Sequence, residues 1–223
     1  GANASLSVSP TTSPGPGFVD SETVAPGAAH DARLHGLTVR WQGAPYAAQL
    51  DVAHKRTSSD AVPGLRPSGT GLKVMAGWRY MPGAQISVIG VRVALKDLAV
   101  PMAGFAARGD DLSQWGWGFA WEHMITPKVQ LLASAGVLRD AKGCTSVVAG
   151  AAGRGCKDTG ATSYMVAARY LFSKRTAVYA SLNQVKNRAN GTLDYTGMAL
   201  NAVPNLSPGA DPRIIALGII HNF

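Results

Sequence analysis

The chain has few charged residues and no long hydrophobic run. Aspartate, glutamate, lysine and arginine make up 15% of its 223 residues, against about 25% in typical soluble proteins. No stretch approaches the roughly 18 consecutive apolar residues that a membrane-spanning helix needs. These shortages exclude a helical membrane protein. A membrane β-barrel is still possible, because barrel strands are short and only half apolar.

Cysteine is scarce as well. Only Cys144 and Cys156 occur, and both lie in a stretch rich in glycine and alanine. A structural zinc site would need two more soft ligands nearby, and this stretch offers none. We therefore predict no metal site and a loop disulfide between Cys144 and Cys156, formed in an oxidising compartment and worth about 3 kcal/mol.

The chain shows neither a secretory signal nor a block of basic residues. The opening Gly1-Ala-Asn-Ala-Ser lacks a basic and an apolar segment, so an exported protein that begins here would be a mature form or a fragment. The formal net charge is +8, but the basic residues are scattered and no recognition helix is present. Nucleic acid is therefore not an expected partner.

Signatures of catalysis are missing too. The sequence has no Gly-x-Ser-x-Gly elbow, no His-Glu-x-x-His motif and no phosphate-binding glycine loop. His54, His123 and His221 share the apolar side of alternating segments, which is a poor place for a general base. We predict no enzyme activity and no cofactor.

The most informative feature present is the alternating segment at the carboxy terminus. Ile215, Leu217, Ile219, His221 and Phe223 fall on one face of a strand. Such a strand suits a membrane barrel, because lipid covers its outer face and a neighbouring strand takes its edge.

Eight earlier segments alternate in the same way, which predicts about nine strands in all. They are 35–41, 46–55, 72–81, 89–96, 114–123, 129–137, 164–170 and 178–182. In the segment 89–96 we place Ile89 and Val91 on the apolar side and Arg92 and Lys96 on the polar side. Residues 1–33 are rich in Ser, Pro and Gly and are expected to be a loop, while 34–223 are expected to hold the barrel strands.

Short and long connections alternate between these segments, as they do in outer-membrane barrels. Large aromatic residues lie on the apolar face beside the short turns or at the terminus, as in a layer at a membrane–water interface. These predicted interface aromatics are Trp41, Tyr46, Tyr80, Trp121, Tyr170 and Phe223.

Three segments resemble the trimeric general porins of Gram-negative bacteria, in their β-proteobacterial form. Residues 162–180 are similar to a strand, a Ser-Lys-Arg-Thr periplasmic turn and the following strand of that family. Residues 218–223 are similar to its last strand, which ends in phenylalanine, and 31–41 resemble the segment after its constriction loop.

The resemblance implies an all-β fold, a sixteen-stranded antiparallel transmembrane β-barrel. It also implies a homotrimer in the lipid of the bacterial outer membrane, inserted by the barrel-assembly machinery. The chain is shorter than the family, and residues 1–33 would be a remnant of the constriction loop. An antiparallel barrel needs an even strand number, so an upstream strand is missing, hidden in 1–33 or supplied by another chain. We interpret the chain as a carboxy-terminal portion or a shortened variant.

The predicted function is a water-filled pore for passive diffusion of small hydrophilic solutes and ions. The predicted pore-lining residues are Arg40, Lys55, Lys73, Arg79, Arg92, Lys96, Glu122 and Arg169. Their excess of positive charge favours anions modestly, unless acids from elsewhere in the barrel pair with them. The alternative function is a surface adhesin or binding protein that acts through its long external loops.

Overall fold

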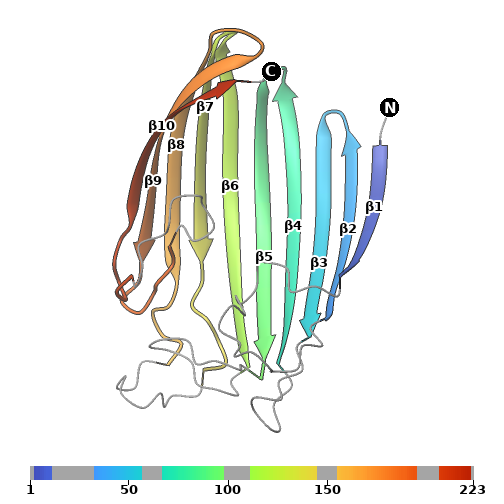
Figure 1. Cartoon of the computed structure of the whole chain (residues 1–223), viewed down its shortest axis with the longest axis vertical. Helices are drawn as coiled ribbons and strands as arrows, with labels where there is room; N and C mark the ends of the chain where they lie inside the picture. The colour runs from blue at the N-terminus through green and yellow to red at the C-terminus, as the bar shows by residue number, and fades with distance from the viewer. Residues whose placement is uncertain are drawn as a thin grey trace.

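The chain folds into a single antiparallel sheet of ten strands (Figure 1). The computed structural model describes residues 3–11, 33–56, 67–97, 111–144, 155–194 and 206–221. The strands are β1 (Asn3–Thr11), β2 (Arg33–Gly43), β3 (Tyr46–Arg56), β4 (Ser68–Met81), β5 (Ala84–Lys96), β6 (Leu112–Thr126), β7 (Val129–Leu138), β8 (Ala161–Leu171), β9 (Thr176–Asn187) and β10 (Arg213–His221). None of the described residues belongs to a helix long and apolar enough to cross a membrane.

Each strand pairs with the next one along the chain, so the strand order in the sheet is the order in the sequence. Connections of two to four residues join β2 to β3, β4 to β5, β6 to β7 and β8 to β9 at one end, which we call the turn end. The remaining connections are longer and leave the strands at the opposite end, the loop end. The prediction of an all-β antiparallel fold with alternating short and long connections is confirmed.

One strand lies where the sequence predicted a loop. β1 occupies Asn3–Thr11 and pairs along its whole length with β2. The expectation that all of 1–33 is a loop is therefore wrong for these nine residues and for Arg33, where β2 begins. Of the alternatives left open for an upstream strand, β1 corresponds to the one hidden in 1–33. The alternation in Leu6-Ser-Val-Ser is short and stands beside a Pro/Gly-rich stretch, so composition outweighed periodicity in the prediction.

The register separates two faces of the sheet, because directly paired residues point to the same side. One row joins Trp41, Ala48, Ala76, Val88, Phe119, Ala135, Tyr164, Gln184 and Arg213. We call the side that carries this row the apolar face, and the side that carries Arg40, Asp51 and Lys73 the polar face. Large hydrophobic side chains on the apolar face are widely exposed, up to 79% for Leu217.

The faces of β5 are the reverse of the prediction. Arg92 pairs with Leu72 and Trp115, and Lys96 pairs with Ser68, so both basic residues are on the apolar face. Ile89 pairs with Met75 and Gly118, which places it on the polar face. The predicted assignment of this strand is therefore wrong.

Glycines on the neighbouring strand explain the orientation of β5. A Cβ added at Gly118 would lie 2.7 Å from Ile89, and one at Gly116 would lie 3.3 Å from Val91. On the opposite face a Cβ at Gly90 would lie 2.8 Å from the Trp117 ring. On both faces a large side chain thus covers a glycine of the paired strand. This packing places Ile89 and Val91 on the polar face of β5 and Gly90 on its apolar face.

Candidate pore-lining surface

Four cations lie on the polar face of β2, β3 and β4, and we call them the basic wall: Arg40, Lys55, Lys73 and Arg79. The register brings Arg40 opposite Gln49, and Lys73 opposite Asp51. The predicted residues of these three strands therefore share one surface. Their alternation with large apolar residues made them readable from sequence, because neighbouring residues in a strand face opposite sides.

Asp51 is the acid at the centre of the basic wall. Its carboxylate receives hydrogen bonds from Thr38 Oγ1 at 2.8 Å and from Gln49 Nε2 at 2.9 Å, and it pairs with Lys73 Nζ at 2.8 Å. These contacts hold the carboxylate in place and neutralise Lys73. Lys73 therefore contributes little to the net field of the surface.

Arg40, Lys55 and Arg79 have no ion-pair partner within the part of the chain that the structure describes. Once its side-chain amide is oriented to accept, Gln42 receives hydrogen bonds from the guanidinium of Arg40, the shorter of them 2.6 Å. Arg40 and Arg79 border the same surface hollow, whose lining includes Gly77 and Ser87. The hollow thus combines two uncompensated cations with small neighbours.

A second polar cluster lies on β6, β7 and β8. Gln130 Nε2 donates to Glu122 Oε1, and Gln130 is directly paired with Arg169. Gln130 is only 3% exposed, and its Oε1 and the Nε of Arg169 have no hydrogen-bond partner among the described residues. This cluster carries one acid and one base, so it adds no net charge to the polar face.

Arg92 and Lys96 are not part of this surface. The prediction grouped them with the basic wall, whereas the register puts them on the apolar face near the loop end. The guanidinium of Arg92 stacks over the Trp115 ring, with its carbon 5.1 Å from the ring centre. The uncompensated positive charge of the polar face therefore comes from fewer residues than the sequence suggested.

The predicted interface aromatics that the structure describes lie on the apolar face at the turn end. Trp121 Nε1 donates to Tyr80 Oη at 2.9 Å, and the same oxygen is 2.8 Å from Nδ1 of His123. The His123 ring stacks on Trp121, with ring centres 5.5 Å apart. Trp41, Tyr46 and Tyr170 are exposed beside short turns. Phe223 lies outside the described residues.

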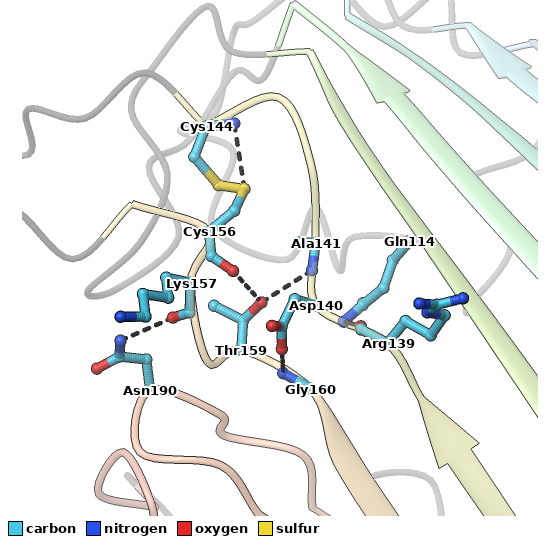
Figure 2. The surroundings of a disulfide bond; sticks show 10 residues. All are labelled: Gln114, Arg139, Asp140, Ala141, Cys144, Cys156, Lys157, Thr159, Gly160 and Asn190. Atoms are coloured by element: carbon cyan, nitrogen blue, oxygen red, sulfur yellow. Dashed lines mark hydrogen bonds between the residues drawn. A yellow bond between two sulfur atoms is a disulfide. The ribbon is translucent and has the colours of Figure 1, made fainter.

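A disulfide joins Cys144 and Cys156 at the loop end (Figure 2). The disulfide and Leu95 pack against Leu112, which is buried. Leu112 belongs to the residues of β6 that lie on the polar face. Thr159 Oγ1 accepts from Ala141 N and donates to Cys156 O, each at 2.9 Å. The described ends of the connection after β7, 139–144 and 155–160, are thereby held together and against Leu112.

We expect the double variant C144S/C156S to lose order mainly in this connection. The chain-entropy estimate for a loop of this size is about 3 kcal/mol, and the contacts of Thr159 depend on the same closure. Limited proteolysis should cut the variant between β7 and β8 while wild type resists. The single variant T159V, which keeps the disulfide, is the control for loss of the hydrogen bonds alone. Equal protection of wild type, T159V and C144S/C156S against proteolysis would contradict the role of the disulfide.

Sequence reasoning missed the amide and hydroxyl groups that organise the polar face. Thr38, Gln42 and Gln49 fix Asp51 and Arg40, and Gln130 fixes Glu122. Alternation placed Gln49 and Gln130 on the polar side. Gln49 and Asp51 lie two residues apart on β3, whereas Gln130 reaches Glu122 on β6 and Thr38 reaches Asp51 from β2. Only the cross-strand register shows these last two pairs. No group of three or more metal-ligating side chains occurs within the described ranges.

No protein-family model matches the chain, and no curated protein matches its sequence. Among solved structures it is similar to an anion-selective porin from Comamonas acidovorans, with a TM-score of 0.64 and 20% identity. The chain has a porin-like fold. The match covers 86% of this chain and 49% of that porin, so the chain spans about half the length of the porin.

Proposed function

We propose that the chain forms the wall of a water-filled pore in a bacterial outer membrane. The pore allows small hydrophilic solutes and ions to diffuse passively, with a modest preference for anions. No bond-making step and no cofactor are part of this proposal. Assembly into homotrimers and insertion by the barrel-assembly machinery stay predictions.

The observation that carries the proposal is the division of the sheet into two unlike faces. On the apolar face Leu217 is 79% exposed, Ile215 73% and Ile219 69%. Soluble proteins rarely leave such a broad apolar surface in water, whereas a membrane barrel covers it with lipid. The opposite face carries both acids of the described strands, Asp51 and Glu122, together with the basic wall.

The charge balance of the polar face supports the anion preference. Lys73 is neutralised by Asp51, and Glu122 and Arg169 balance each other in charge. Arg40, Lys55 and Arg79 then leave an excess of three positive charges on this face in the described strands. An excess of fixed positive charge raises the local concentration of anions and lowers that of cations. The matching solved porin is itself described as anion-selective.

Planar-bilayer recordings test this function directly. We expect the purified chain to produce stepwise conductance and, across a potassium chloride gradient, a reversal potential on the anion side. A reversal potential on the cation side would contradict the role of the basic wall. A protein that inserts without conducting would contradict the pore itself and favour a surface-binding role for the loop end.

A further inference from the structure

The apolar face carries a group of cations at the loop end, which we call the rim cations: Arg56, Arg92, Lys96, Lys186 and Arg213. Register places each of them on the side that bears Trp41 and Phe119. All five are exposed. Charged residues on a lipid-facing surface are costly in the hydrocarbon region, so their position along the strands decides what they contact.

Every rim cation lies far from the turn end. Strand β5 begins at Ala84, so Arg92 is its ninth residue and Lys96 its thirteenth. Counted from the same end, Arg56 and Lys186 are the eleventh residues of β3 and β9, and Arg213 is the ninth of β10. A membrane-crossing strand needs about 9–11 residues. Counted from the turn end, the rim cations lie at or beyond the far edge of such a span, which would place them at the headgroup layer next to the loop end.

Among the described residues, no ion pair compensates the rim cations. Within the described strands no aspartate or glutamate lies on the apolar face, since Asp51 and Glu122 are both on the polar face. None of the five forms an ion pair among the residues that the structure describes. Arg213 donates to Gln184, a neutral partner. Within the described strands, the group therefore presents positive charge with no acidic partner on the apolar face.

Three of the rim cations form a compact patch over β3 to β6. Arg56 and Lys96 are both paired with Ser68, so they flank one strand. Arg92 lies over Trp115, and the Trp115 ring stacks on Trp117 with ring centres 6.1 Å apart. The patch thus joins positive charge toward the loop end with an exposed aromatic surface beneath it.

We propose that this patch, formed by Arg56, Arg92, Lys96 and Trp115, binds the phosphate headgroup of an anionic lipid. The lipid chains would run down the apolar face past Trp117. The inference rests on the proposed membrane location but is independent of the pore. A phosphate accepts several hydrogen bonds from arginine and lysine at once, and aromatic rings suit the boundary between headgroup and hydrocarbon.

Lipid binding to the purified chain in neutral detergent micelles tests the proposal. Phosphatidic acid with brominated chains should quench tryptophan fluorescence, and R92Q/K96Q should weaken this binding about tenfold or more. The variant K174Q/R175Q, at the β8–β9 turn, removes the same charge at the opposite end and should bind like wild type. Brominated phosphatidylcholine should show no difference among the three proteins. R92K/K96R, which keeps both charges, should retain most of the affinity.

Equal loss in R92Q/K96Q and K174Q/R175Q, or no loss in either, would overturn the proposal. Displacement of the lipid by millimolar inorganic phosphate would also overturn it, because free phosphate would then be the ligand. R56Q/K96Q leaves Arg92 over Trp115 and gives a second test should R92Q/K96Q fail to fold. Reversal potentials of the same preparations distinguish failure of this proposal from failure of the proposed pore. A variant that loses lipid binding but keeps its ion selectivity has lost only the function of the patch.

Discussion

Replacing Val166 by arginine should leave most of the protein molecules unable to fold into membranes. Val166 is the sixth of the eleven residues of β8, is 55% exposed on the apolar face and pairs with Ala133 and Leu182. Arginine at the middle of a lipid-facing strand costs about 2–4 kcal/mol. Because the variant places a cation in hydrocarbon, we expect a large fall in the folded fraction. Urea titration in vesicles and the heat-dependent shift in gel mobility measure it.

Ala167 provides the matched control. It is the next residue of the same strand, but it pairs with Leu132 and Ser181 on the polar face. A167R should fold nearly as well as wild type, because its guanidinium reaches water. Equal damage by the two substitutions would show that both sides of β8 are packed in protein, and the assignment of the apolar face to lipid would fail.

The second large effect is expected for R40Q/R79Q. These two cations border the same hollow on the polar face and have no acidic partner in the described part of the chain. One charge about 4 Å from a passing ion changes its energy by about 1 kcal/mol in water, which corresponds to about a fivefold change in local concentration. Removing both should shift the reversal potential strongly toward cations and lower conductance for anions.

Asp51 supplies a control of opposite sign. D51N removes the acid that neutralises Lys73, so it should increase anion preference where R40Q/R79Q decreases it. The two variants alter charge on the same surface, and a nonspecific loss of structure would not move selectivity in opposite directions. Shifts in the same direction would contradict the view that both groups face the permeating ions.

Alternation within single strands made much of the fold readable. Trp115, Trp117, Phe119 and Trp121 of β6 predicted its apolar side without any knowledge of its neighbours. The side of Arg40 in β2 followed in the same way. In both strands one face is rich in large apolar residues and the other is not, so a shift by one residue would be costly.

Strand β5 shows where that reasoning stops. Apolar residues occupy both of its sides, with Ile86 and Val88 on one and Ile89 and Val91 on the other. The deciding contacts are with Gly116 and Gly118 on β6. A glycine gives no sign in the sequence of which large side chain will cover it, and the prediction relied on the charge of Arg92 instead.

The strand order of the sheet has a consequence for how the chain reaches its final form. Because every strand pairs with its sequence neighbours, growth needs no crossing segment and no distant strand to arrive first. Each new hairpin meets an edge that the preceding one has just exposed, so loop-closure entropy stays low at every step. A halted intermediate would therefore be a narrower version of the finished sheet, with native contacts in place and one open edge ready to continue.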